Sequence, residues 1–262
     1  MEQNILHSKI YGQEKPGSPL LVFHGLFGML DNWATFGKEF GELFPTHLID
    51  LRNHGKSFQS DEMNYPVLVE DILNYMNFHG LQKINLLGHS LGGKVVMSFA
   101  ITYPEKVEKL IVADISPKAY PPHHQGIFKA LKSVDFDKIT TRQEAENILS
   151  QYISSKSVIQ FLSKNLYWTD DKKLNWRFNL KALDEHYNEF VTNAIQFGKF
   201  MGETLFIGGE KSDYILPEDQ FLIKEQFPNS TIISISNAGH WVQAENPKDF
   251  NEAVKSFLIG SF

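Results

Sequence analysis

The chain has 262 residues, of which 42% are hydrophobic and 21% are charged, which is enough apolar material for one large α/β domain or two small ones. Its 25 Lys and Arg face 31 Asp and Glu, giving a formal net charge of −6, and no basic arm or stripe stands out. This balance argues against nucleic acid or an anionic membrane surface as a main partner. The absence of Cys excludes disulfides, thiolate nucleophiles and Cys-ligated metal sites.

The N-terminal residues 1–7 lack the basic stretch followed by an apolar stretch that a secretory signal requires. The longest apolar runs have the length of strands and fall short of the roughly 20 residues that a membrane-spanning helix needs. We therefore expect a soluble, cytoplasmic protein with no membrane partner. Its oligomeric state is not set by the sequence.

Short apolar runs alternate with longer helical patterns along the chain. The runs predicted as strands cover residues 19–23, 47–49, 83–87, 109–113, 204–207 and 231–235. Their continuous apolarity is typical of parallel strands covered on both faces. Four-residue spacing predicts one helix through Leu91, Val95 and Phe99, and another through Phe250 and Val254 after Pro247. The pattern predicts a mainly parallel twisted sheet flanked by helices.

The interval from about Lys118 to about Phe200 breaks this alternation. It contains no convincing strand, and helical patterns cover residues 125–132, 142–153, 158–165 and 180–190. We expect an all-helical insertion, so that residues 1–117 and 201–262 form the core and residues 118–200 form a helical cap. Its many aromatic residues are expected to form its own core, with a subset facing the active site.

The sharpest motif is Gly88-His89-Ser90-Leu91-Gly92, which lies between a predicted strand and a predicted helix. A G-x-S-x-G sequence in this context forms a tight turn that lifts the serine hydroxyl above the sheet edge. The helix N-terminus beneath it favours developing negative charge. Ser90 is therefore the candidate nucleophile.

A serine hydroxyl needs a base, and in this architecture the base is a histidine beyond the last strand. His240, in Asn237-Ala238-Gly239-His240-Trp241, follows the last predicted strand and precedes the final helix. His89 is the immediate neighbour of Ser90, and we expect it to point away from the nucleophile.

Backbone N–H groups must also face the oxygen of a tetrahedral intermediate. Leu91 follows the nucleophile and supplies one candidate donor. The loop His24-Gly25-Leu26-Phe27-Gly28 follows an early strand, and we assign the second donor to Leu26. The side chain of His24 is expected to brace this loop.

Two aspartates qualify as the acid that orients the histidine. Asp114 ends the run at 109–113, and Asp213 lies in the loop after the run at 204–207. Either could hold the imidazole and stabilise the imidazolium, and the residues alone do not choose between them.

No motif indicates a cofactor or a metal. His123-His124 is an isolated pair with no evident third ligand, so no metal site is assigned. The stretch from Asp50 to Ser57 is interpreted as an architectural turn after a strand.

The motifs at His24-Gly25, Asp50 to Ser57, Gly88 to Gly93 and Gly239-His240 together resemble the α/β-hydrolase superfamily. A closer resemblance, to the ybfF-type esterase branch, lies in the sequences of three segments: the His24 loop, Asp114-Ile115-Ser116-Pro117, and Asn237 to Val242. This resemblance implies an α/β-hydrolase fold with a helical cap between the sixth and seventh strands. It also favours Asp114 as the acid, although Asp213 keeps its place as the alternative.

The same resemblance implies that Ser212 lies near the catalytic residues, with Tyr214 close by. We expect His24, Gly25, Tyr214 and Trp241 to contribute to substrate binding. The predicted activity is a serine esterase that hydrolyses a small carboxylic ester or thioester through an acyl-enzyme on Ser90. Two alternatives remain open: a C–C hydrolase or lyase using the same residues, and a ligand receptor that keeps a hydrolase pocket.

Overall fold

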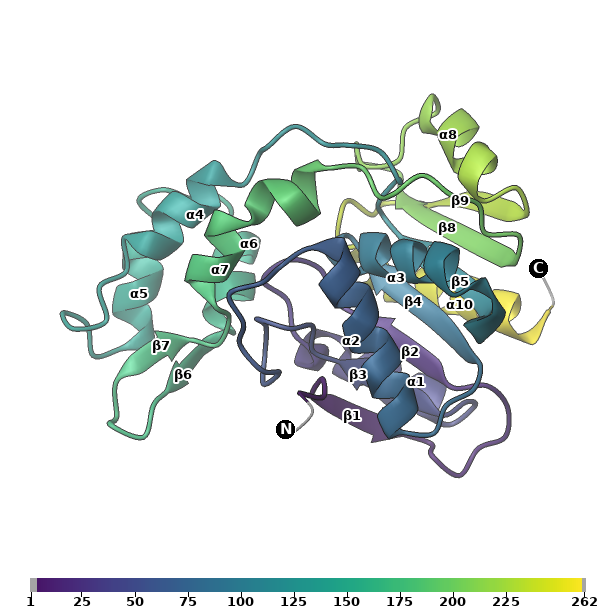
Figure 1. The fold of residues 1–262 in the computed structure, drawn as a ribbon. Helices are drawn as coiled ribbons and strands as arrows, with labels where there is room; N and C mark the ends of the chain where they lie inside the picture. The colour runs from purple at the N-terminus through teal and green to yellow at the C-terminus, as the bar shows by residue number, and fades with distance from the viewer. Residues whose placement is uncertain (1–3, 261–262) are drawn as a thin grey trace.

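The computed structural model describes residues 4–260. Residues 1–3, where the stretch considered for a secretory signal begins, lie outside that range. Within it, one sheet contains seven strands in the order β1-β3-β2-β4-β5-β8-β9 (Figure 1). Their bounds are Ser8–Tyr11 (β1), Leu20–Phe23 (β2), Thr46–Ile49 (β3), Ile84–His89 (β4), Val107–Ala113 (β5), Glu203–Gly209 (β8) and Ser230–Ile235 (β9).

The strand prediction is confirmed at all six positions. Every pair that these six strands form with one another is parallel, as the continuous apolar runs predicted. β1 was not predicted, and it pairs antiparallel with β3 at the edge of the sheet.

Helices cover both faces of the sheet, because successive side chains on each strand point to opposite sides. Leu21 and Phe23 of β2 pack in a core with α2 (Tyr65–Phe78), α3 (Leu91–Thr102) and α8 (Asp219–Gln226). Leu20 and Val22 pack on the other face with α1 (Ala34–Gly41) and α10 (Pro247–Ile259). Residues 88–92 join β4 to α3, which covers the first of these two faces.

The two predicted helices begin where the sequence indicated. α3 starts at Leu91 directly after the serine turn and buries Val95 and Phe99. α10 starts at Pro247, with the Asn246 side chain accepting a hydrogen bond from the Asp249 N–H, and it buries Phe250 and Val254.

The insertion between β5 and β8 contains α4 (Gln125–Lys132), α5 (Arg142–Leu149), α6 (Lys156–Ser163), α7 (Leu180–Glu185) and a π-helical turn (Asn188–Thr192). Figure 1 shows it in teal and green at one end of the core. The expectation that it is all-helical is wrong: β6 (Leu166–Trp168) pairs antiparallel with β7 (Leu174–Trp176). These strands of three residues are too short to give a periodic signal. Among the described residues the insertion follows the fifth strand of the chain rather than the sixth.

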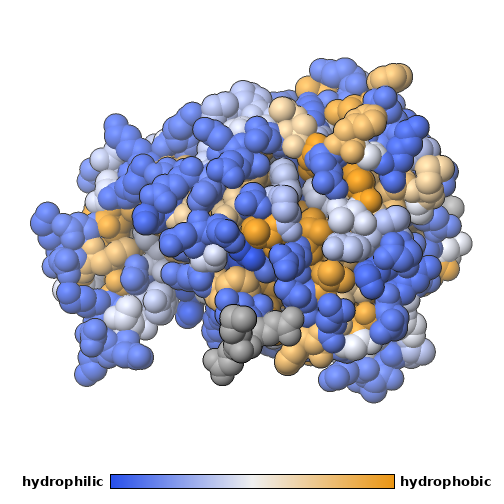
Figure 2. All heavy atoms as spheres, in the orientation of Figure 1, coloured by the Kyte–Doolittle hydropathy of each residue, from blue (hydrophilic) through white to orange (hydrophobic). Residues whose placement is uncertain are grey.

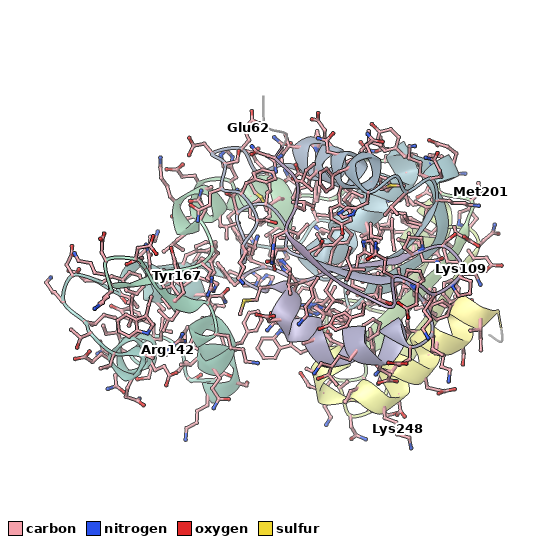
Figure 3. The ribbon with its side chains drawn as sticks, turned by 90° about the horizontal axis from the view of Figure 1, so that it is seen from below. Glu62, Lys109, Arg142, Tyr167, Met201 and Lys248 are labelled. Atoms are coloured by element: carbon pink, nitrogen blue, oxygen red, sulfur yellow. The ribbon has the colours of Figure 1, made fainter. Side chains whose placement is uncertain are left out.

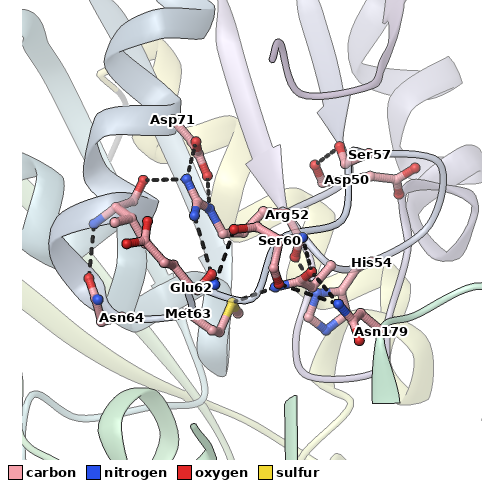
Figure 4. Close-up of polar contacts among 12 residues, drawn as sticks. Asp50, Arg52, His54, Ser57, Ser60, Glu62, Met63, Asn64, Asp71 and Asn179 are labelled. Carbon is pink, nitrogen blue, oxygen red and sulfur yellow. Dashed lines mark hydrogen bonds and ion pairs between the residues drawn. The ribbon is translucent and has the colours of Figure 1, made fainter. Parts of the chain in front are cut away.

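The stretch from Asp50 to Ser57 is a turn held by its own side chains (Figure 4). The Asp50 carboxylate accepts hydrogen bonds from the N–H groups of Leu30 and Lys56, and the Ser57 hydroxyl donates to the Asp50 carbonyl. Arg52 binds Asp71 of α2 through two nitrogens at 2.6 and 2.7 Å. These bonds support the architectural interpretation of this stretch.

That turn also connects the core to the insertion. The Asn179 amide donates to the Asn53 side chain at 3.2 Å and to the Ser60 carbonyl at 3.3 Å, as Figure 4 shows. The Asn179 side chain in turn caps α7 by accepting a bond from the Ala182 N–H. The start of α7 is therefore fixed to the core rather than free.

The visible face in Figure 2 is mostly hydrophilic with scattered apolar side chains, as is usual for a globular surface. Figure 3 places Arg142 and Tyr167 on the insertion and Lys109 and Met201 toward the opposite end of the core. Within residues 4–260, no helix combines the length and the apolarity that crossing a membrane requires.

Candidate active site

Ser90 occupies a strained turn between β4 and α3. Its backbone has φ 52° and ψ −115°, a left-handed φ that a residue with a side chain rarely adopts. The Ser90 N–H donates to the Ala113 carbonyl of β5 at 3.0 Å, which fixes the turn to the neighbouring strand. The geometry agrees with the strand–turn–helix context predicted from the motif.

Glycines around this turn are required by close backbone contact. A Cβ on Gly88 would lie 2.3 Å from the Gly92 carbonyl oxygen, and one on Gly92 would lie 2.5 Å from the Phe23 carbonyl oxygen. A side chain at either position would separate β4 from α3 or α3 from β2. The spacing of the motif is therefore set by packing as well as by chemistry.

Asp114 and His240 are hydrogen-bonded. His240 Nδ1 lies 2.7 Å from Asp114 Oδ2, and the Asp114 side chain is fully buried while His240 is partly exposed. Because a carboxylate accepts, Nδ1 carries the proton and Nε2 is left free to accept one. Asp114 is also held at φ 50°, so its turn, like that of Ser90, is a constrained one.

The buried carboxylate of Asp114 accepts two further hydrogen bonds. The Gly209 N–H donates to Oδ1 at 3.0 Å, and the Ser212 hydroxyl donates to Oδ2. Ser212 therefore contacts Asp114 directly. Asp213, the alternative acid, is exposed to solvent at the neighbouring position.

The loop after β2 lies against the serine turn. A Cβ on Gly25 would lie 3.3 Å from the Ser90 Cβ, so the glycine allows the loop backbone to approach the nucleophile. The N–H groups of Phe27, Gly28, Met29 and Leu30 all donate to acceptors within the protein. Leu26 lies between Gly25 and these residues and lines the same cavity as Ser90, and its role as an oxyanion donor stays a prediction.

His24 braces that loop, as expected. It is buried, and its ring accepts from the Leu51 N–H at 3.1 Å and donates to the Gly25 carbonyl at 2.8 Å. Burial lowers the pKa of His24 to about 4, so it stays neutral and can accept at one nitrogen.

A cavity of about 350 Å³ lies above Ser90. Ser90 and His240 both line it, as do four residues predicted to bind substrate: His24, Gly25, Tyr214 and Trp241. Its remaining wall is largely apolar and comes from the core and from α4 and α6 of the insertion, with Trp33, Ile127, Val158, Phe161 and Leu162. The aromatic subset expected from the insertion is represented in this wall by Phe161, which packs against Trp241 at 5.3 Å between ring centroids.

His89 lines the same cavity, and its expected orientation away from the nucleophile stays a prediction. Its Nε2 donates to the His240 carbonyl at 2.7 Å, and the two rings lie 4.8 Å apart. Burial lowers the pKa of His89 to about 3, and neighbouring His240 adds to the effect. A neutral His89 that donates to the His240 backbone supports the histidine loop rather than serving as a base.

The predicted residue Tyr214 is joined at the site by His123 and His124, whose contacts were not found from the sequence. Tyr214 stacks on the His240 ring with centroids 3.9 Å apart, and its hydroxyl meets His123 of the insertion. His124, beside it, bonds to the Tyr187 hydroxyl at 2.7 Å. The pair His123-His124 thus binds tyrosines, and among residues 4–260 no cluster of three or more His, Asp or Glu side chains is arranged to hold a metal ion.

Lys94 is the least expected of these residues. It lies one helical turn after Ser90 and is 1% exposed, although a lysine in that helix would be predicted to face solvent. Burial lowers its pKa to about 7. Its neighbours in the sequence gave no indication that Lys94 is buried, because the segment that covers it, with Val191 and Asn193, belongs to the insertion.

A model of the alpha/beta hydrolase fold family matches residues 18–247. The chain belongs to the α/β-hydrolase family. It is 34% identical over 242 residues to Esterase YbfF of Escherichia coli, covering 92% of this chain and 93% of that protein, which confirms the resemblance to that esterase branch. It is 35% identical over 249 residues to the sn-1-specific diacylglycerol lipase ABHD11 of Mus musculus, covering 92% and 81%.

A solved structure named as a marine microorganism esterase superposes on this α/β hydrolase with a TM-score of 0.94 at 37% identity. The match covers 97% of this chain and 100% of that one. That esterase therefore shares the architecture of this chain, including the insertion.

Proposed function

We propose that this α/β hydrolase is a serine carboxylic ester hydrolase that forms an acyl-enzyme on Ser90. The observation that carries the proposal is the 2.7 Å hydrogen bond from His240 to buried Asp114, with His240 and Ser90 lining one cavity. Relatives named as an esterase and a diacylglycerol lipase support the reaction class. Thioesters fall within the same proposal, because the chemistry at the carbonyl carbon is the same.

In the first half of the reaction, Ser90 Oγ bonds to the ester carbonyl carbon while His240 Nε2 takes the hydroxyl proton. The N–H groups of Leu26 and Leu91 hold the resulting oxyanion. His240 then gives the proton to the leaving alcohol as the carbon–oxygen bond breaks.

In the second half, a water molecule attacks the acyl-enzyme. His240 accepts a proton from that water, and returns a proton to Ser90 Oγ as the carboxylic acid departs. Asp114 stabilises the imidazolium at both stages. The reaction so written needs no cofactor or metal.

The composition of the cavity favours an ester over a multiply charged substrate. Within residues 4–260, no Lys or Arg lines the cavity of about 350 Å³ at Ser90. Lys118 and Lys132 of the insertion are paired with Asp219 and Asp184. A C–C hydrolase or lyase acting on a carboxylated substrate would need fixed cations there, so that alternative ranks second.

The test is labelling with a fluorophosphonate, followed by turnover of p-nitrophenyl and thioester substrates. We expect stoichiometric labelling of the wild-type protein, no labelling of Ser90→Ala, and loss of turnover by orders of magnitude in that variant with little change in unfolding. A variant that keeps most of its activity would contradict the proposal. Single-turnover labelling with tight product retention would favour the receptor alternative.

Three further assignments belong to this proposal. Residues 1–117 and 201–262 act as the hydrolase core, and residues 118–200 act as the cap over the cavity. The partner is a small ester, and the Cys-free composition fits a cytoplasmic location.

A further inference from the structure

Two cavities meet at Ser90. Besides the large one, a small cavity of about 20 Å³ is lined by Ser90, Leu91, Lys94, Ile115 and Tyr120, among others. Leu26, Ser90, His124 and Tyr214 belong to both linings. A substrate bound at Ser90 therefore has one roomy side and one confined side.

The position of the histidine decides which part of an ester lies on which side. His240 lines the large cavity and is absent from the lining of the small one, considering the described residues. A general acid must reach the leaving-group oxygen, so the leaving alcohol belongs on the side of the histidine. The acyl group then extends toward the small cavity, beside the proposed oxyanion donor Leu91.

We infer that the small cavity is the acyl site and that Lys94 fixes the wall that limits the size of the acyl group. This enzyme then prefers short acyl groups, of about acetyl size, on bulky leaving groups. The inference rests on the proposed serine-esterase function and names its substrate class. A space of about 20 Å³ is comparable to one water molecule and admits about a methyl group. The large cavity of about 350 Å³ has room for an aromatic or branched alcohol.

Part of the wall of the small cavity comes from the two segments that join the insertion to the core. Tyr120 lies on the outgoing segment, and Val191 lies on the returning one. The Tyr120 N–H donates to the Thr192 carbonyl at 2.8 Å, and the Ile195 N–H donates to the Pro117 carbonyl at 3.2 Å. The two segments are therefore bonded to each other where they pass over Ser90.

Lys94 ties both segments to helix α3. Its Nζ donates to the carbonyls of Val191 and Asn193 at 3.0 and 2.6 Å, and it lies 4.9 Å from the centroid of the Tyr120 ring. Because an unpaired buried amine is costly, these contacts hold the wall at a fixed distance from the nucleophile. Lys94 is accordingly a positioning residue for the acyl site.

The first experiment varies one side of the ester at a time. With p-nitrophenol as the constant leaving group, we expect kcat/KM to fall by about tenfold or more from acetate to octanoate. With acetate as the constant acyl group, we expect 1-naphthyl acetate to be hydrolysed at least as efficiently as methyl acetate. An enzyme that prefers octanoate, as a long-chain lipase would, overturns the placement of the acyl group.

The second experiment changes the wall. Lys94→Met keeps an unbranched side chain but removes both hydrogen bonds to the returning segment, and Val191→Ala enlarges the cavity without touching Lys94. We expect each variant to raise the ratio of kcat/KM for butyrate over acetate several-fold, about fivefold or more. The matched control is Lys109→Met, which removes a lysine bonded at 2.8 Å to the Phe257 carbonyl at the opposite end of the core.

The results distinguish the role of Lys94 from the position of the acyl site and from the proposed esterase function. The control is expected to keep the wild-type ratio, and an equal shift in the control would mean that any lost lysine loosens the fold and would overturn the assignment of Lys94. If the butyrate-to-acetate ratio stays at its wild-type value in Lys94→Met but rises in Val191→Ala, the position of the acyl site stands and the role of Lys94 is overturned. Absence of labelling and of ester turnover in the wild type would instead refute the proposed function.

Discussion

Replacing Asp114 by Asn tests the proposed acid most directly. The carboxylate accepts from the Gly209 N–H at 3.0 Å, from the Ser212 hydroxyl, and from His240 Nδ1 at 2.7 Å. An Asn amide of the same shape would keep its oxygen toward the Gly209 N–H, which cannot accept a bond. Its NH2 group would then face Ser212 and His240.

That orientation reverses the hydrogen bond to the imidazole. The Ser212 hydroxyl can rotate to accept, but His240 Nδ1 must also become an acceptor, which moves the ring proton to Nε2. A histidine protonated at Nε2 cannot take the proton of Ser90. We therefore expect kcat to fall by about 10³- to 10⁴-fold, which corresponds to about 4 to 5.5 kcal/mol of transition-state stabilisation.

The assay compares kcat and KM for p-nitrophenyl acetate in Asp114→Asn and in Asp213→Asn, with urea unfolding of both proteins. Asp213 is exposed, so its variant serves as the matched control and is expected to stay within about twofold of wild type. The reasoning is refuted if Asp213→Asn is the more damaging change, or if Asp114→Asn stays within tenfold of wild type while folded.

Three further predictions follow from single contacts. Ser212→Ala removes one of three bonds to the Asp114 carboxylate, and should lower kcat by about tenfold while KM stays near its wild-type value; an unchanged kcat would show that the bond is dispensable. Gly92→Ala places a Cβ 2.5 Å from a carbonyl oxygen and should lower the free energy of unfolding by about 1–3 kcal/mol. Gly126→Ala, with open space around it, is the control and should be neutral or slightly stabilising. Urea denaturation compares the two variants, and equal effects would contradict the packing explanation. The pKa of Lys94 is lowered from 10.5 to about 7, so between these pH values the unfolded chain holds a proton that the native protein lacks. The free energy of unfolding should therefore rise with pH by about 1.4 kcal/mol per unit. This rise, measured by urea denaturation from pH 7.5 to 9.5, should be absent in Lys94→Met, and an equal rise in both proteins would contradict the prediction.

The Ser90 turn was predictable because its requirements are local. A strand, a sharp turn and a helix leave a sequence pattern within about fifteen residues, and Gly88 is required by its contact with Gly92 inside the motif, whereas Gly92 is required by the Phe23 carbonyl of β2. The identity of the histidine followed from its place after the last predicted strand. The parallel sheet followed from continuous apolar runs, which two covered faces demand.

Short and half-exposed elements left no comparable signal. β1 has four residues at the sheet edge, and β6 and β7 have three each, so neither alternation nor length distinguishes them from loop. The contact of His89 was also beyond local reasoning, because its ring bonds the carbonyl of a residue 151 positions away.

The two candidate carboxylates were separated only by the fold. Asp114 and Asp213 follow strands that are neighbours in the sheet, and it is Asp114, at a turn with φ 50°, whose carboxylate bonds His240. Lys94 likewise depends on the insertion folding back over α3. The sequence by itself determined the local geometry of the nucleophile and the class of sheet, since these depend on neighbours along the chain. The tertiary structure alone placed the Asp114 carboxylate against His240 and buried Lys94, because both contacts join segments about a hundred residues apart in the chain.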